Sequence, residues 1–300
     1  MEYFIVGLQI DRHPKLELTE SKFNNLKSAR RALFSGLWIE EKYELLLSNF
    51  IEFEKQYLSL LTDDMIGGNI FGSSYLDQFN VRLELNRRLV NFLTSSRLYL
   101  DQVVQEVMKC VPENCDVKRT LQKYKSEEFD DNFEYRFMEA LRNYVQHHGL
   151  PIHNLKGGVK ADEDGHKQVH MKLFTSKEML LNDDNFKKGV IEEMSDNVEL
   201  RYAARVYIGC ISRIHTKVRE LISLKLDRSR ELVQVALADY ADLVSKNVNT
   251  IYLVHSPAEP ILYEELSLFL DWDNVRVELT KKNRSLVNFQ ERYVSGKFDS

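Results

Sequence analysis

The sequence predicts a mainly α-helical protein with a few short strands. Apolar residues recur at steps of three and four over several long stretches, and this spacing forms one face of a helix with about 3.6 residues per turn. Only five prolines and twelve glycines interrupt the 300 residues, and 43% of the chain is hydrophobic. Such a composition can fill a core and is typical of a globular helical protein.

The helical pattern is strongest between residues 37 and 61 and between residues 74 and 109. Because a modest loop around Gly67 and Gly68 joins these segments, we expect an antiparallel helix pair. Thr19 is a candidate N-cap for an earlier helix. The same spacing predicts further helices over residues 117–125, 130–148, 197–226 and 230–246.

Short segments rich in β-branched and aromatic residues predict strands. They cover residues 3–10, 169–174, 250–254 and 275–279.

Gly157, Gly158 and Gly165 interrupt the chain among alternating charges and indicate an internal boundary. We therefore expect a helical bundle with a short N-terminal strand over residues 1–155, and an α-rich region with minor β structure over residues 156–300. Pairing of the N-terminal strand with strands of the second half would instead pack both parts as one interlocked unit.

The net charge is −5 and the pI is about 6.0. Bulk charge therefore does not indicate nucleic-acid binding, which would need a local basic patch or the groove of a dimer. No apolar run approaches the roughly 20 residues of a membrane span, and the first residues lack the basic leader of a signal peptide. We expect no membrane partner and a cytoplasmic location.

Three cysteines, Cys110, Cys115 and Cys210, fit no zinc or disulfide framework. An odd number at irregular spacing is typical of free thiols in a reducing compartment.

A row of polar residues follows one side of the helix expected over residues 130–148. Glu139, Asn143 and His147 are spaced four apart, so they stack along the helix, and Arg142 stands beside them. Histidine can transfer protons near neutral pH, and arginine can hold a phosphate through two parallel hydrogen bonds. Asn143 can orient the imidazole or bind a phosphate oxygen, and Glu139 can hold the histidine or arginine. Such a set can cleave RNA without a metal, because the 2′-hydroxyl of the substrate attacks the adjacent phosphorus.

The run from Arg142 to His147 resembles the motif of the HEPN superfamily, in which an arginine, often followed directly by a polar residue, precedes a histidine by a few positions. The resemblance covers about residues 37–153. It implies a small helical bundle and a metal-independent RNA endonuclease of the kind found in toxin–antitoxin and phage-defence systems.

The resemblance also implies the site and its partners. Arg142, Asn143 and His147 would be catalytic, with Glu139, Gln146 and His148 in support. The expected partners are RNA, a second copy that brings two motifs face to face in a homodimer, and an antitoxin or regulatory protein. No cofactor and no metal are implied.

Two other interpretations of the motif stay open. Arg142 and His147 can be helix-terminal groups that interact favourably with the helix dipole, or the chain can be a non-catalytic helical module that binds protein or nucleotide. A metal site is disfavoured, because the adjacent His147 and His148 point about 100° apart on a helix and no His-Glu-x-x-His pattern occurs.

Short basic clusters are candidate phosphate contacts, although such runs are more often solvated helix faces. Arg30 and Arg31 form one. Asn86, Arg87 and Arg88 form another, which would line the RNA groove if the helix over residues 74–109 packs beside the motif.

Overall fold

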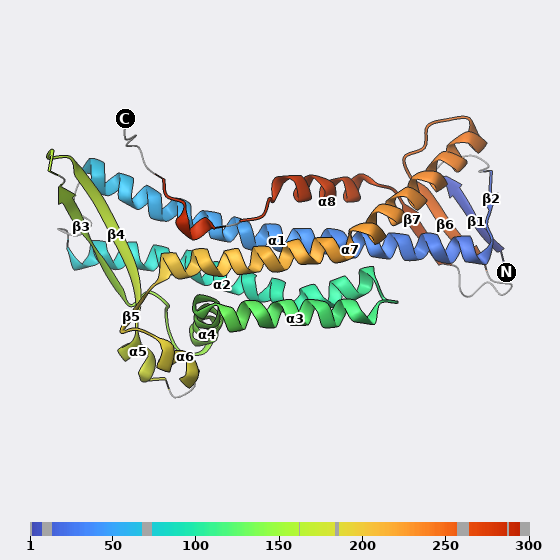
Figure 1. Cartoon of the computed structure of the whole chain (residues 1–300). Coiled ribbons are helices and arrows are strands. Elements are labelled where there is room, and N and C mark those ends of the chain that lie inside the picture. The colour runs from blue at the N-terminus through green and yellow to red at the C-terminus, as the bar shows by residue number, and fades with distance from the viewer. Residues whose placement is uncertain are drawn as a thin grey trace. The chain divides into compact units, whose positions relative to one another are not determined.

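The computed structural model describes residues 2–7, 14–67, 74–161, 163–183, 186–256, 264–286 and 288–294. Within these ranges the chain forms eight α-helices and seven short strands (Figure 1), which confirms the mainly α-helical class. The expected residues 8–10 of the first strand and the predicted loop at Gly68 lie outside the described ranges. No helix among the described residues has the length and apolar character needed to cross a membrane.

The chain divides into two compact units, each made of segments that are distant in sequence. Unit 1 contains residues 1–41, 102–121 and 217–284, and unit 2 contains residues 42–101, 122–216 and 285–300. The expected boundary between residues 155 and 156 is therefore not where the contacts divide the chain. Strand pairing between the two halves of the sequence explains why.

Unit 1 is built around an antiparallel sheet in the order β2-β1-β6-β7. Its strands are β1 (Glu2–Gly7), β2 (Leu16–Glu17), β6 (Ile251–Ser256) and β7 (Glu264–Leu268). In the register of β1 with β6, Phe4 lies opposite Val254, so the N-terminal strand pairs with a strand of the second half of the sequence.

Buried side chains connect this sheet to the helices of unit 1. The Tyr240 hydroxyl accepts a hydrogen bond from the Gly7 N–H at 2.7 Å and donates one to the Pro14 carbonyl at 3.1 Å. A Cβ atom on Gly7 would lie 2.8 Å from the Tyr240 ring, so only glycine permits this close approach.

Helix α1 (Glu20–Gly67) begins beside the sheet of unit 1, and α2 (Tyr75–Cys110) follows it in the chain. Thr19 caps α1, because its hydroxyl accepts the Lys22 N–H at 3.2 Å. Within unit 2, Tyr43 packs on Tyr99 and Phe50 packs on Phe92. Residue numbers therefore rise along α1 in the direction in which they fall along α2. This confirms the predicted antiparallel pair.

The remaining elements of unit 2 pack on this pair. They are α3 (Cys115–Asp131) from residue 122 onward, α4 (Phe133–His147) and the antiparallel sheet β3-β4-β5. The strands are β3 (Asn154–Ala161), β4 (Lys167–Ser176) and β5 (Asn197–Glu199), and the short helices α5 (Lys177–Leu181) and α6 (Lys188–Glu193) lie between β4 and β5.

Two sequence predictions in the second half were wrong. The helices expected over 197–226 and 230–246 are one helix, α7 (Leu200–Val244), since no proline or glycine follows Leu226 to end it. The strand expected over 275–279 lies inside α8 (Asp271–Lys282). Acidic residues in the first turn of α8 and lysines in its last turn complement the helix dipole, and this signal outweighs the short β-branched run.

Cys110 and Cys210 are buried free thiols, as predicted. Burial raises the pKa of each to about 12, so both are protonated and unreactive near neutral pH.

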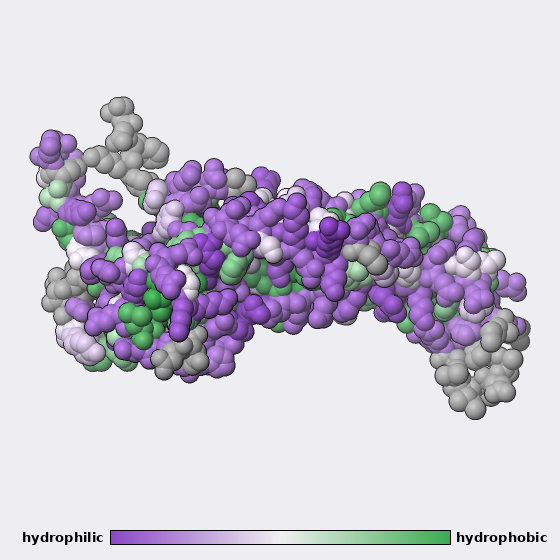
Figure 2. Space-filling view, turned by 60° about the horizontal axis from the view of Figure 1, so that its bottom comes forward, coloured by the Kyte–Doolittle hydropathy of each residue, from purple (hydrophilic) through white to green (hydrophobic). Residues whose placement is uncertain are grey.

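Exposed apolar side chains are scattered over the described surface, and Figure 2 shows them as separate patches on a mostly hydrophilic face.

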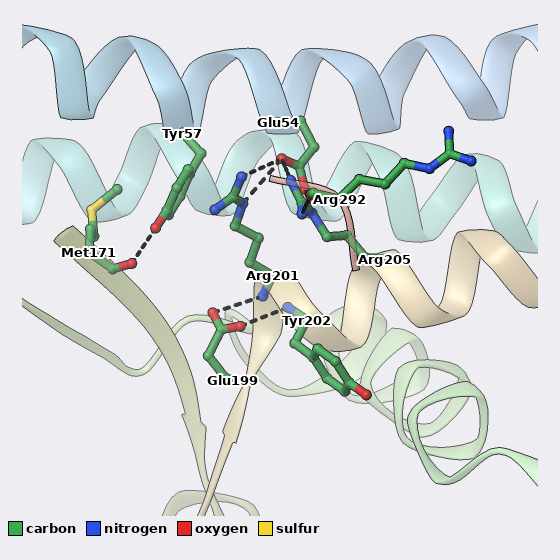
Figure 3. Close-up of polar contacts among 8 residues, drawn as sticks. All are labelled: Glu54, Tyr57, Met171, Glu199, Arg201, Tyr202, Arg205 and Arg292. Atoms are coloured by element: carbon green, nitrogen blue, oxygen red, sulfur yellow. Dashed lines mark hydrogen bonds and ion pairs between the residues drawn. The ribbon is translucent and has the colours of Figure 1, made fainter. Parts of the chain in front are cut away.

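A buried ionic cluster joins α1 to α7 inside unit 2 (Figure 3). Glu54 on α1 is 8% exposed, and its carboxylate accepts hydrogen bonds from Arg205 at 2.6 and 2.7 Å and from Arg201 at 3.0 and 3.1 Å. Arg205 also donates to the Arg292 carbonyl at 2.6 Å, which holds the segment after residue 288. Both carboxylate oxygens are therefore satisfied, and the burial of these charges is compensated.

The start of α7, next to this ionic cluster, is fixed by Glu199. The Glu199 carboxylate accepts the N–H groups of Arg201 and Tyr202 at 3.1 and 2.7 Å (Figure 3), which satisfies two donors of the first turn. One turn beyond Glu54, the Tyr57 hydroxyl donates to the Met171 carbonyl on β4, while the Arg201 guanidinium lies 4.0 Å from the Tyr57 ring centroid. Helix α1 is thereby linked to both α7 and the sheet.

Replacing Glu54 by glutamine is expected to lower the free energy of unfolding by about 3–5 kcal/mol, because Arg205 would remain buried without its counter-charge. Urea unfolding followed by far-UV circular dichroism measures the change. Glu52→Gln is the matched control, since Glu52 lies on the exposed side of the same helix. Equal stability of the two variants would show that the cluster contributes nothing beyond a surface charge.

Candidate functional site

Helix α4 carries the predicted motif in unit 2. Its buried face is formed by Tyr135, Phe137, Met138, Ala140 and Leu141. Phe133 and Tyr144, near the two ends of the helix, are only half-buried.

Helix α4 ends where the sequence places Gly149. The Tyr144 carbonyl accepts the N–H groups of both His148 and Gly149, at 2.8 and 3.3 Å. A Cβ atom on residue 149 would lie 2.7 Å from the Tyr144 hydroxyl. The absence of a side chain at Gly149 lets the chain turn tightly beside Tyr144.

The segment after α4 is held by buried hydrogen bonds. Asn86 on α2 accepts the Ile152 N–H at 2.9 Å, and the Thr175 hydroxyl donates to the Pro151 carbonyl at 2.6 Å. His153 accepts the Ser176 N–H on its Nδ1 at 3.1 Å. These contacts fix the end of the motif helix against α2 and β4.

The three residues predicted to be catalytic lie on the last two turns of α4, and two of them are in contact. The half-buried Arg142 donates to the Asn143 Oδ1 at 3.0 Å. His147 is exposed, and its ring lies 6.3 Å from that of His148. Because His147 forms no hydrogen bond with any described residue, its ring nitrogens are open to solvent or to a ligand.

The supporting residues have different environments. Gln146 is exposed, whereas His148 lies 3.2 Å from the carboxylate of Asp183 and stacks on Tyr144. Glu139 receives a hydrogen bond from Arg97 at 3.0 Å and another from the buried hydroxyl of Tyr207. Burial and the charge of Glu139 raise the pKa of Tyr207 well above its ordinary value. The Tyr207 hydroxyl therefore keeps its proton and donates the hydrogen bond to this carboxylate. Glu139 therefore binds Arg97 of α2, which does not belong to the motif.

The basic run on α2 has a structural explanation. Asn86 is 1% exposed and holds the Ile152 backbone, so its side chain packs inside unit 2 instead of facing RNA. Arg87 and Arg88 both bind Glu84. These hydrogen bonds lower the pKa of Glu84 to about 2, so the pairs persist throughout the neutral range.

A polar pocket of about 390 Å³ opens beside the predicted motif in unit 2. It brings together two members of the polar row with three cations from other segments. Its lining residues are Arg97, Leu100, Lys125, Ser126, Phe129, Tyr135, Glu139, Asn143 and Lys187.

The cations of this pocket are fixed in different ways. Lys125 donates to the Leu100 carbonyl at 2.7 Å, and burial lowers its pKa. Arg97 binds Asp101 at 2.8 Å as well as Glu139. Lys187 is exposed and lies 5.3 Å from the Phe129 ring centroid. Arg97 is already paired with two carboxylates, whereas Lys125 and Lys187 form no ion pair with a described residue. The positive charge of these two lysines favours an anion.

Sequence reasoning found Glu139 and Asn143 but missed Arg97, Lys125 and Lys187. These three cations come from α2, α3 and the segment before α6, so no spacing along the sequence relates them. Among the described residues, no group of three or more histidine, cysteine, aspartate or glutamate side chains could hold a metal ion.

No protein-family model, curated protein or solved structure matches this chain.

His153 makes the end of the motif helix sensitive to acid. Burial lowers the pKa of His153 below its ordinary value of 6.5, because desolvation disfavours the charged ring in the folded protein. The unfolded chain therefore binds more protons as the pH falls through that ordinary value, and folding stability decreases. We expect His153→Gln to lose less stability than the wild type between pH 7 and pH 5.

Urea unfolding at both pH values measures this difference, and His166→Gln serves as the control because His166 is exposed on the turn between β3 and β4. If the stability of His153→Gln depends on pH as that of the wild type does, His153 is not the source of the acid sensitivity.

Proposed function

We propose that the chain is a metal-independent RNA endonuclease whose reacting groups are Arg142, Asn143 and His147. The observation that supports this proposal most is the position of Asn143. It belongs to the polar row of α4, binds Arg142 at 3.0 Å, and also lines the cationic pocket. A phosphodiester held by the cations of that pocket would lie beside the last turn of α4, where the exposed His147 stands.

Each side chain has a defined role in the proposed reaction. The 2′-oxygen of the RNA attacks the adjacent phosphorus, its proton passes to an imidazole, and the bond from phosphorus to the 5′-oxygen breaks. The leaving 5′-oxygen takes a proton from an acid, and a 2′,3′-cyclic phosphate remains. Arg142 and Asn143 stabilise the charge that develops on the phosphoryl oxygens.

A homodimer would supply the second proton-transfer group. One imidazole cannot accept the 2′-proton and donate to the 5′-oxygen in the same step, whereas His147 of a second copy can take the second role. The exposure of His147 and Gln146 at the end of α4 is compatible with such an arrangement. An antitoxin or regulatory protein would act by covering this surface.

His147→Ala is expected to reduce RNA cleavage by about 10²–10⁴-fold, the usual contribution of a general acid or base. Wild-type protein and variant are incubated with a labelled RNA in EDTA, and the products are resolved by gel electrophoresis. His166→Ala removes another exposed histidine and should cleave like the wild type.

Three outcomes would contradict the proposal. Equal cleavage by His147→Ala would remove His147 from the mechanism, and cleavage that depends on added metal would remove the mechanism itself. Binding of RNA without any cleavage would favour the alternative, a non-catalytic binding module.

The pocket makes a separate prediction about affinity. Lys187→Gln should weaken binding of single-stranded RNA and reduce the slope of log affinity against log salt by about 0.7, the value for one lost phosphate contact. Fluorescence anisotropy at several salt concentrations measures this slope. Lys188→Gln is the matched control, because Lys188 is the exposed neighbour that does not line the pocket. An equal slope change in both variants would mean that the pocket does not contact phosphate.

A further inference from the structure

Unit 1 contains a second cationic pocket, with a volume of about 730 Å³. Its lining combines four cations with two aromatic rings from α1, the last turn of α2, and β7. The lining residues are Lys27, Arg30, Arg31, Phe34, Ser35, Trp38, Lys109, Glu264 and Leu266. This volume is within the range of small-molecule sites, about 300–1,000 Å³.

Two arginines of this pocket keep donors available for an anion. Arg30 donates its Nε to the Ser267 carbonyl at 2.7 Å, and its terminal nitrogens bind no described residue. Burial lowers the pKa of Arg30, as expected for a desolvated cation without an acidic neighbour. Arg31 is exposed and makes no hydrogen bond or ion pair within the described part of the chain.

The other charges of the pocket are largely balanced. Lys27 neutralises Glu264, with 2.5 Å between Nζ and Oε1, and Lys109 binds Glu106 at 3.2 Å. The unbalanced charge is therefore that of Arg30 and Arg31. Two adjacent guanidinium groups can bind the oxygens of one phosphate.

The aromatic side of the pocket offers a stacking surface. Phe34 is stacked on Trp272 with 3.9 Å between ring centroids, and the Arg30 guanidinium lies 4.6 Å from the Phe34 centroid. Trp38 is 43% exposed, so its indole retains open surface. A planar base can stack on such a ring.

A buried hydroxyl supplies an independent sign of a ligand. Ser35 is 1% exposed and lines the pocket, yet its Oγ has no hydrogen-bond partner among the described residues. A buried polar group without a partner is unfavourable, whereas a ligand oxygen or nitrogen would satisfy it.

We propose that this pocket of unit 1 binds a nucleoside phosphate, with the base stacked on Trp38, the phosphate held by Arg30 and Arg31, and a polar group of the ligand bonded to Ser35. The site uses no residue of α4 and does not depend on the proposed nuclease activity. The same chemistry occurs in a free nucleotide and in one nucleotide of an RNA strand.

The protein has an internal probe for this binding. Its only two tryptophans are Trp38 and Trp272, and both contact Phe34. Saturable quenching of tryptophan fluorescence therefore reports on this pocket. The full-length His147→Ala protein is titrated in EDTA and low salt with AMP, adenosine, inorganic phosphate and a hexamer of adenylate, so that no substrate is cleaved through the α4 site.

AMP is expected to bind at least about tenfold more tightly than adenosine, since the phosphate adds charge-assisted hydrogen bonds. Inorganic phosphate should quench less than AMP, because it cannot stack. Arg31→Gln should weaken AMP binding by about tenfold or more, whereas Arg228→Gln, an exposed arginine of α7 outside the pocket, should have no effect. Tighter binding of the hexamer than of AMP would identify an RNA strand as the ligand, and equal or weaker binding would identify a free nucleotide.

The proposal is overturned if neither AMP nor the hexamer gives saturable quenching, or if adenosine binds as tightly as AMP. It is also overturned if Arg31→Gln binds AMP like the control variant. Because Arg31 is exposed and unpaired with any described residue, its replacement should leave the fold intact, which circular dichroism verifies.

Discussion

The Glu54 carboxylate, held by two guanidinium groups, organises the part of unit 2 on which the candidate site depends. It is buried on α1 and bonded to Arg201 and Arg205 on α7. An unpaired carboxylate there would be strongly destabilising, and the two arginines compensate its charge. Tyr57 extends the same linkage to β4, and β4 in turn fixes the segment after α4 through Thr175 and Ser176.

This chain of contacts fixes the end of α4, whose candidate site residues Asn143 and His147 are exposed. The buried face of the helix is apolar, and the following turn is fixed by Asn86, Gly149 and Pro151. The polar row is thereby presented on a rigid element. Rigid presentation of reacting groups is what catalysis or specific phosphate binding requires.

The sequence predicted the elements with strong periodicity but not the way they combine. The antiparallel pair of α1 and α2, the cap at Thr19 and the polar row of α4 follow from local spacing. The prediction of two helices in place of α7 was wrong, because no proline or glycine ends the helix near residue 227. Asn86 stands beside two arginines, a pattern typical of a surface, but tertiary packing buries its side chain against the Ile152 backbone.

The cationic pockets show a further limit of sequence reasoning. A chain with a net charge of −5 gives no bulk indication of anion binding. Each unit nevertheless places cations from separate segments around one cavity. Such local concentration arises from tertiary packing, so only Arg30 and Arg31, which are adjacent in sequence, were recognisable beforehand.

The chemical nature of the product ends tests the central functional claim most directly. An RNA of defined sequence is incubated with the wild-type protein in EDTA, and the fragments are analysed by mass spectrometry. Attack by the 2′-oxygen predicts fragments that end in a 2′,3′-cyclic phosphate and begin with a 5′-hydroxyl. Fragments with a 3′-hydroxyl and a 5′-phosphate, or an RNA that remains intact, would contradict the account.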